Sequence, residues 1–297
     1  MTSPEPAPSG PPAGQPLVAV PVRHYGRWVS GALVLAALTW LVLAFARADI
    51  GYGTTGEFFT AENVIRGAGR TLLVSVLAQA IGIALGVLFA VMRLSRNPVT
   101  SSVAWAYIWL FRGTPVLVQL LIWYNLALVF PTIAGHPTSD LMTPFLAALL
   151  GLGINEGAYM AEIVRAGIGS VDEGQTEAAQ ALGMTRAQTL RRVVLPQAMR
   201  VIIPPTGNEF INMLKTSSLA YTIQYGELLL SAVAVYTNNL QVIELLFTVS
   251  LWYLVLTSVF SVGQYYLERR FSRGAARAQE QTPLARLVSN LRGRPRL

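Results

Sequence analysis

The only lysine of this 297-residue chain, Lys215, lies in a mostly apolar stretch beside other polar residues. Asn208, Asn212 and Lys215 are spaced i, i+4 and i+7, which places them on one face of a helix. Glu209 lies about 60° from Asn212 at ~100° per residue. Ionisable groups are costly in lipid, so such residues within apolar segments are candidates for a polar pathway. We predict a pathway lined by Asn155, Glu156, Asn208, Glu209, Asn212 and Lys215.

Two simpler roles for these polar groups stay open. They could satisfy one another's hydrogen bonds, or anchor loops near the cytosolic interface. Nearby, Glu162 and Arg165 are spaced i and i+3, and we expect them to form a structural ion pair. Arg112, in the sequence FRGTP, is expected to bind lipid phosphate, with the bracing of an inner gate as the alternative.

The sequence argues against chemistry performed by this chain alone. It contains no cysteine, and His24 and His136 are far apart, so a metal site is not expected. Lys215 follows a leucine rather than a glycine-rich loop, which excludes a P-loop for ATP. Ser217 and Ser218 lie near Lys215 but lack a loop that would position a nucleophile. We therefore predict no enzymatic activity and no cofactor for the isolated chain.

The composition is typical of a membrane protein. Hydrophobic residues make up 53% of the chain and charged residues only 12%, against about a quarter in soluble domains. Residues 48–69 are expected to form a polar loop. We predict an all-α polytopic membrane protein with about six transmembrane helices, at residues 28–46, 71–92, 103–130, 144–166, 199–236 and 242–267.

Two of these predicted spans have distinctive patterns. The span 71–92 carries a face of small and polar residues that would let another helix approach closely, namely Thr71, Ser75, Gln79, Gly82 and Gly86. The span 199–236 contains Pro204 and Pro205 just before the polar face of Lys215. We expect a break there, enclosed by protein, because lipid cannot satisfy the freed backbone groups.

The arginine positions predict an orientation. With the N-terminus inside and six alternating spans, 18 arginines lie inside and three lie outside. Both termini are therefore predicted to be cytosolic. The basic residues are spread over separate loops, so we expect contact with anionic membrane lipids and no nucleic-acid partner. Residues 1–22, with seven prolines, and the basic residues 272–297 are predicted to be disordered cytosolic tails.

A polar segment, residues 167–198, separates the fourth and fifth predicted spans. Acidic residues at its start suit the first turn of a helix, and Gly183 is placed to end that helix in a left-handed conformation. Thr185 is suited to cap a second short helix that runs through Val194 and ends or bends at Pro196. We expect a cytosolic projection that fits a groove of a partner through Ala178, Ala179, Ala181 and Leu182.

The spacing in this projection resembles the EAA signature of permease subunits in type I ABC importers. The matching positions are Glu177, Ala178, Ala179, Gly183, Val193, Leu195 and Pro196. Other segments are similar to the polar amino-acid uptake branch of those permeases: FRGTPVLVQL (111–120), GAYMAEIVRAGI (157–168), GNEFINMLKTSSLAYTI (207–223) and SVGQYYLERRF (261–271). The resemblance covers residues 67–271, which would hold the five-helix core. Residues 23–66 would then form an additional N-terminal helix and an external loop.

The resemblance implies a permease of the bacterial plasma membrane that forms the path for ATP-driven uptake of a polar or charged amino acid. It implies three protein partners. A P-loop ATPase subunit binds ATP and Mg and grips the EAA loop as a coupling helix, an extracytoplasmic binding protein delivers the amino acid, and a second permease completes the path. The alternative is a stand-alone secondary amino-acid transporter. That class would need two similar repeats, whereas the two halves of this sequence differ in loop length and motif.

Overall fold

The computed structural model describes residues 25–48 and 50–271, which belong to two separate units. The first unit, residues 1–50, contains helix α1, and the second begins at Gly51 and contains the other elements. The predicted disordered tails, 1–22 and 272–297, lie outside the described residues. Across the described ranges the secondary structure is helical apart from one short β-hairpin, so the predicted all-α fold is confirmed.

Helix α1 (Tyr25–Arg47) has the properties of a transmembrane helix. Its segment Trp28–Arg47 has a mean hydropathy of 2.3. The 23 residues of the helix extend about 34 Å at ~1.5 Å per residue, which matches a hydrocarbon layer of roughly 30 Å. Leucine, valine and alanine are distributed around the whole helix rather than on one stripe, as expected for a lipid-exposed span.

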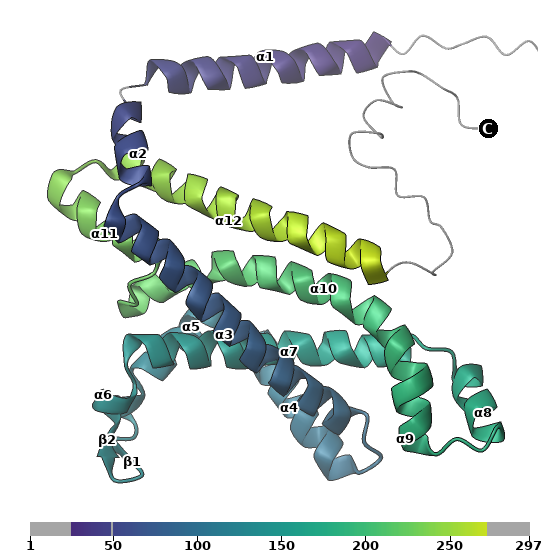
Figure 1. Cartoon of the computed structure of the whole chain (residues 1–297). Helices are drawn as coiled ribbons and strands as arrows, with labels where there is room; N and C mark the ends of the chain where they lie inside the picture. The colour runs from purple at the N-terminus through teal and green to yellow at the C-terminus, as the bar shows by residue number, and fades with distance from the viewer. Residues whose placement is uncertain (1–24, 49, 272–297) are drawn as a thin grey trace, which may run out of the picture. The chain divides into compact units, whose positions relative to one another are not determined.

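Four long helices form most of the second unit, namely α3 (Glu62–Arg93), α7 (Pro144–Gly169), α10 (Leu195–Thr216) and α12 (Val242–Phe271). One of them, α3, runs at an angle to the other three in Figure 1. Helix α7 packs against both α3 and α10, and α10 also packs against α12. Helices α7 and α10 are therefore the central members of this group.

The close packing of α3 against α7 depends on small residues. A Cβ atom added at Gly82 would collide with Cγ of Glu156, and one added at Gly86 would collide with Cβ of Met160. The predicted small and polar face of α3 is buried throughout, at Thr71, Ser75, Gln79, Gly82 and Gly86. The prediction that this face packs against another helix is confirmed.

Helices α4 (Pro98–Gly113) and α5 (Val116–Tyr124) also pack against α7 and are bent relative to each other by 101°. Between them, Thr114 is extended, with φ −117° and ψ 144°. A residue that precedes a proline, here Pro115, is disfavoured in the helical conformation. The predicted interruption of the third apolar region at FRGTP is thus confirmed.

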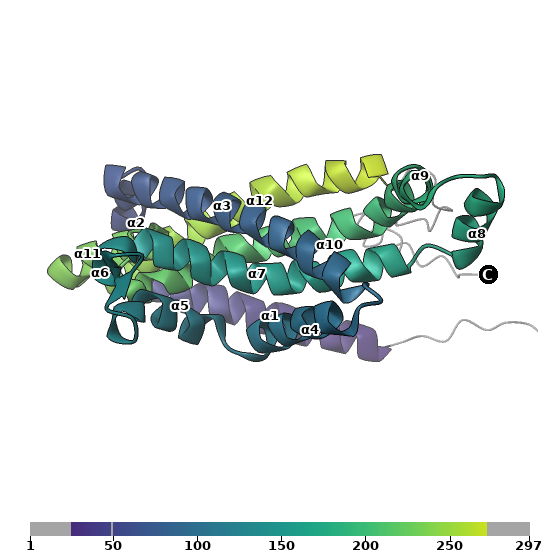
Figure 2. The same ribbon diagram turned by 90° about the horizontal axis from the view of Figure 1, so that it is seen from below.

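The connections between the long helices lie at two opposite ends (Figure 2). One end carries the turn η1 (Leu126–Leu128), the hairpin β1 (Thr132–Ile133) and β2 (His136–Pro137), α6 (Thr138–Leu141) and α11 (Leu228–Asn239). The strands are antiparallel, with Ile133 opposite His136. The opposite end carries α8 (Glu173–Ala181) and α9 (Arg186–Thr189), which project beyond α7 and α10.

The expectation of a polar loop at residues 48–69 is wrong. This segment contains the helix α2 (Tyr52–Phe59) and the start of α3. Helix α2 is held by α12: Trp252 Nε1 donates a hydrogen bond to the carbonyl oxygen of Phe59 at 2.9 Å, and the two rings stack 5.0 Å apart. The local sequence is short and contains two glycines, so its helicity depends on tertiary contacts.

The expected break of residues 199–236 at Pro204–Pro205 is also misplaced. Helix α10 runs through both prolines, and the chain breaks later, in the 3-10 turn η3 (Ser217–Ile223). Helix α10 packs against both α7 and α12, and Gln264 of α12 donates a hydrogen bond to the carbonyl oxygen of Pro204 at 3.1 Å. Gln224 then ends η3 in the left-handed conformation, with φ 61°.

The long helices differ in how apolar they are. Among the described residues, three segments are long and apolar enough to cross a membrane alone: Trp28–Arg47, Glu62–Arg93 and Val242–Phe271. The bent pair α4 and α5 counts as a fourth if it is one span. Helices α7 and α10 have 26 and 22 residues, enough to span a bilayer, but they carry polar residues. Their central position removes them from lipid, so they tolerate those residues.

Candidate functional site

The predicted pathway residues surround a cavity of about 880 Å³ in the second unit. Its walls come from the α4–α5 break, the middle of α7, the second half of α10 and the start of η3. Of the six predicted residues, five line this cavity: Asn155, Glu156, Glu209, Asn212 and Lys215. Helices α7 and α10, which are separated in the sequence by α8 and α9, thus both contribute polar groups to this cavity.

Asn208 is the exception. It does not line this cavity, and its Oδ1 atom accepts a hydrogen bond from Gln264 Nε2 of α12 at 3.0 Å. The sequence pattern joined Asn208 to Asn212 and Lys215, but α10 is rotated so that Glu209, Asn212 and Thr216 face the cavity. Asn208 therefore contributes to packing between α10 and α12.

Glu156 is the most buried charged residue of the site. Its exposed fraction is 5%, and Gln79 Nε2 of α3 donates a hydrogen bond to its Oε1 at 3.3 Å. The side chain is close to α3 because Gly82 has no Cβ to exclude it. Glu156 is thus fixed at the cavity wall by the tight contact between α3 and α7.

Asn155 has a structural contact that its sequence context did not reveal. Its Nδ2 donates to the carbonyl oxygen of Phe111 at 2.7 Å, at the end of α4. Gln119 Nε2 donates to the same oxygen at 3.0 Å and to the carbonyl oxygen of Thr114 at 3.1 Å. These two amides supply partners for backbone groups freed by the α4–α5 break. Asn155 therefore both lines the cavity and supports its shape.

The cavity carries charges of both signs. Glu156 and Glu209 supply two carboxylates, and Lys215 and Arg112 supply two cationic groups. Lys215 is exposed, and none of the ion pairs within 4.0 Å in residues 25–48 and 50–271 includes Lys215, Glu156 or Glu209. An open space with available charges of both signs suits a small zwitterionic solute.

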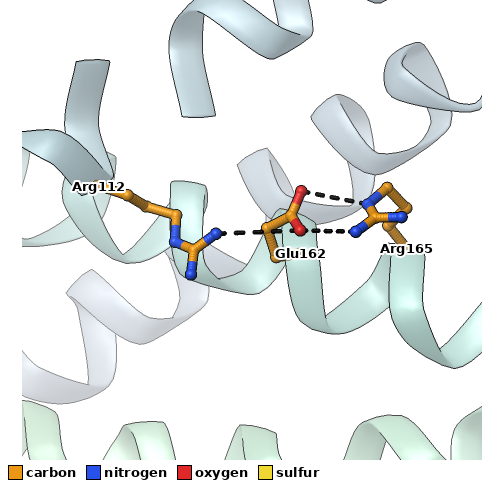
Figure 3. A network of polar contacts seen from close by, with 3 residues as sticks. All are labelled: Arg112, Glu162 and Arg165. Carbon is orange, nitrogen blue, oxygen red and sulfur yellow. Dashed lines mark hydrogen bonds and ion pairs between the residues drawn. The ribbon is translucent and has the colours of Figure 1, made fainter. Parts of the chain in front are cut away.

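A cluster of three charged residues lies next to this cavity (Figure 3). Arg165 donates to Glu162 through Nε at 3.2 Å and Nη2 at 2.8 Å, which confirms the predicted ion pair. Arg112 reaches the same carboxylate from α4 at 3.9 Å, and its guanidinium lies 5.3 Å from the centre of the Tyr159 ring. Arg112 therefore has protein partners on α7, and its expected contact with lipid phosphate stays a prediction.

The projection at the far end of the bundle is built from local capping contacts. Asp172 Oδ1 accepts from the amide of Gly174 at 2.8 Å and caps α8. Gly183 ends α8 with φ 82°, while the amides of Gly183 and Met184 donate to the carbonyls of Gln180 and Ala179. This is the two-bond helix ending that favours glycine, as predicted.

The second half of the projection joins α10 without a loop. Thr185 and Gln188 form a reciprocal capping box at the start of α9. A π-helical turn, η2 (Leu190–Val194), then leads directly into α10 at Leu195. Pro196 therefore lies in the first turn of α10, where its missing amide hydrogen costs little. The short helix ends directly before this proline, and α9 and α10 point in different directions (Figure 1), so the predicted end or bend close to Pro196 is confirmed.

The residues of the predicted EAA signature differ in exposure. Glu177, Ala178, Gly183, Leu195 and Pro196 are exposed, and Val193 is half-buried. Ala179 is only 5% exposed, so it packs within the projection and does not face a partner, contrary to expectation. Leu182 is 85% exposed at the tip, directly before Gly183.

Comparison with known proteins identifies the class. Residues 82–273 match the family described as the binding-protein-dependent transport system inner membrane component. The match covers the bundle from the middle of α3 through α12, including the cavity and the α8–α9 projection. The chain belongs to this family and is a multi-pass membrane protein. The resemblance to ABC importer permeases drawn from the EAA spacing is confirmed.

Individual relatives extend the similarity. The chain is 45% identical over 281 residues to the arginine transport system permease protein ArgU of Corynebacterium glutamicum, covering 92% of this chain and 89% of the relative. It is 37% identical over 209 residues to the glutamine transport system permease protein GlnP of Escherichia coli, covering 70% and 92%. Because the first alignment omits only 8% of this chain, ArgU also has a counterpart of α1.

Solved structures agree with the fold. A crystal structure of an amino acid ABC transporter with histidines matches with a TM-score of 0.64 and 39% identity, covering 70% of this chain and 94% of that chain. An inward-facing structure of the MetNI methionine ABC transporter matches with a TM-score of 0.57 at 19% identity. The match to the MetNI structure covers 71% of this chain and 99% of that chain, and at this identity it shows a similar fold only.

Proposed function

We propose that this chain forms the transmembrane path of an ATP-driven ABC importer for a polar amino acid, with arginine as the first substrate to test. The observation that carries the proposal is the continuity of α10. This helix begins at the α8–α9 projection and carries Glu209, Asn212 and Lys215 to the cavity. From Leu195 to Glu209 the distance along the helix is about 21 Å at ~1.5 Å per residue.

The charges of the cavity support an amino acid as the substrate. An α-amino group suits Glu156 or Glu209, and an α-carboxylate suits Lys215 or Arg112. A side chain that is polar or cationic meets a second carboxylate in the same space. Similarity to a relative named for arginine and to one named for glutamine supports the same class.

The α8–α9 projection is the proposed contact with the ATPase. Its exposed tip, with Leu182 and Gly183, is suited to fit a groove on a separate ATPase subunit, which would bind ATP and Mg. An extracytoplasmic binding protein and a second permease subunit complete the assembly. The projection's end of the bundle carries most of the arginines of the second unit, so we place it, and both termini, in the cytosol.

In this proposal ATP binding moves the projection and α10 together. The η2 turn joins them with no intervening loop, so a displacement of α8 and α9 is passed to the helix that carries Glu209. The cavity would then open alternately to the two sides of the membrane. The permease contributes no covalent chemistry, and its part is to bind, orient and release the amino acid.

Uptake into proteoliposomes tests this function. The tagged chain is reconstituted with its ATPase and binding protein, and uptake of labelled arginine and glutamine is measured with internal or external ATP. We expect uptake of at least one of them that requires ATP on the ATPase side and fails with an ATPase variant that cannot hydrolyse it. Uptake driven by an ion gradient without ATP would instead establish a stand-alone secondary transporter.

A further inference from the structure

A second cavity of about 600 Å³ adjoins the pathway cavity. Its walls come from the end of α3, the second half of α4 and the last turns of α7. The two cavities share three lining residues, Arg112, Gly113 and Tyr159. A solute that moves from one to the other therefore passes the side chain of Arg112. We call the second space the exit cavity, because it extends from the pathway cavity toward the α8–α9 end.

The two cavities differ in charge. The pathway cavity has two acidic and two basic residues. The exit cavity has three arginines, Arg93, Arg112 and Arg165, and one acid, Glu162. Its net charge of +2 attracts an anionic group. In the proposed substrate class, the anionic group that every member shares is the α-carboxylate.

Arg112 is held loosely, whereas Arg165 is held firmly. Arg165 contacts both oxygens of Glu162 at 2.8 and 3.2 Å, while Arg112 reaches one oxygen at 3.9 Å. The two arginine side chains are equally exposed, 43% for Arg112 and 42% for Arg165, so the difference lies in the distances and in the number of bonds. If Arg112 turns away, Glu162 keeps its two bonds to Arg165 and is not left as an unpaired charge.

The backbone next to Arg112 is fixed. Gln119 and Asn155 bind the carbonyl groups of Phe111 and Thr114 on either side of it. Movement in this region therefore belongs to the long Arg112 side chain rather than to the α4–α5 break. The Tyr159 ring, 5.3 Å from the guanidinium, offers a surface on which the side chain can turn without losing contact.

We propose that Arg112 passes the α-carboxylate of the substrate from the pathway cavity to the exit cavity. Without substrate, Arg112 pairs with Glu162. With substrate, the carboxylate replaces Glu162 as the partner of Arg112, and Glu162 stays paired with Arg165. When the amino acid leaves, Glu162 takes its place again. No covalent bond forms or breaks. This inference rests on the proposed amino-acid substrate and adds a specificity-determining residue to it.

Binding to the purified permease–ATPase complex, without the binding protein, tests the exchange. Each amino acid is paired with the same molecule lacking the carboxylate: arginine with agmatine, and glutamine with 4-aminobutanamide. A charge-assisted hydrogen bond predicts that the wild type prefers the amino acid by about ten- to a hundredfold. Arg112→Gln should remove this preference and leave binding of the amine unchanged. Arg112→Lys should keep part of it.

Glu162→Gln gives the opposite expectation. Since it removes the competitor for Arg112, it should tighten binding of the amino acid several-fold and not tighten binding of the amine. Arg66→Gln, which alters an exposed arginine on α3 at the other end of the bundle, is the matched control and should behave as wild type. Retained ATPase activity shows that each variant is assembled.

The outcomes separate the two proposals. If the wild type binds and transports an amino acid and Arg112→Gln keeps the preference for the carboxylate, the role of Arg112 is overturned and the proposed function stands. Equal weakening of amino acid and amine by Arg112→Gln also overturns it, because that result indicates a structural role. If the wild-type complex neither binds nor imports any amino acid, the proposed function fails as well.

Discussion

The α8–α9 projection and the pathway cavity are stabilised in different ways. The projection is held by contacts between residues close in sequence, such as the Thr185–Gln188 capping box and the Gly183 ending of α8. The cavity is held by contacts between distant segments, such as Gln79 with Glu156, which are 77 residues apart, and Asn155 with Phe111, 44 apart. The projection can therefore move as one unit, whereas the cavity changes shape only when whole helices move.

The largest expected effect concerns charges in the cavity. Glu209→Gln and Lys215→Gln should each reduce ATP-dependent uptake about ten- to a hundredfold, the range of a lost hydrogen bond to a charged group. Assembly with the ATPase should be unchanged, because neither residue is near the projection. Asn208→Ala is the matched control on α10, since it faces α12, and should transport normally. Normal uptake by both charge variants would contradict the location of the path.

A change in the packing of α3 against α7 should lower the stability of the complex without altering the charged residues of the cavity. Gly86→Leu places a side chain where Met160 of α7 already lies, and we expect the complex to lose about 1–3 kcal/mol of stability. Thermal unfolding in detergent measures the loss. Gly69→Leu, on the same helix but with open space around it, should unfold as the wild type does. Equal unfolding temperatures for both variants would show that the tight α3–α7 contact is not required.

Backbone strain in the α8–α9 projection should weaken its coupling to the ATPase and leave the pathway cavity unchanged. Gly183→Val forces a β-branched residue into a φ of 82°, at a cost of about 1–2 kcal/mol. We expect uptake and ATPase recovery to fall about 5- to 30-fold, with substrate binding to the isolated permease unchanged. Gly183→Asn should recover much of the activity, because asparagine tolerates this conformation. The prediction fails if valine and asparagine give the same uptake.

The smallest effect is expected at the cap of α9. Thr185→Ala removes the hydroxyl that accepts from the Gln188 amide at 3.3 Å, which costs about 0.5–2 kcal/mol of local stability. Faster amide hydrogen exchange in residues 185–190, with little change in α10, is the expected signature. Thr185→Ser should exchange at the wild-type rate. Faster exchange along all of α10 would show that the projection and α10 do not unfold separately.

The difference between contacts of neighbouring residues and contacts of distant segments also explains which features the sequence could predict. The helix ending at Gly183 and the cap at Thr185 depend on neighbouring residues, so their roles were predictable and are confirmed. The types of residue that line the cavity were also predictable, because ionisable groups in apolar helices are rare. Their orientation was not: a repeat of three and four places both Asn208 and Glu209 near one face, and only the packing of α10 against α12 separates them.

Tertiary contacts account for the other differences. Helix α2 is short, contains two glycines and is held by Trp252 of α12, almost two hundred positions later in the chain. Helix α10 likewise has a distant partner at Pro204, whose carbonyl oxygen accepts a hydrogen bond from Gln264 of α12. Arg112 reaches Glu162, which lies fifty residues later in the chain and also binds Arg165. In each case the deciding partner is distant in sequence.

Affinity purification of the tagged chain from its native membrane tests the central claim most directly, that a separate ATPase grips the α8–α9 projection. Proteins that co-elute in mild detergent are identified by mass spectrometry, and ATP hydrolysis is measured in the eluate. We predict that a P-loop ATPase co-elutes with the wild type and is lost from Gly183→Trp, whose bundle stays folded. Recovery of a folded wild-type chain alone, without ATPase activity, would contradict the account.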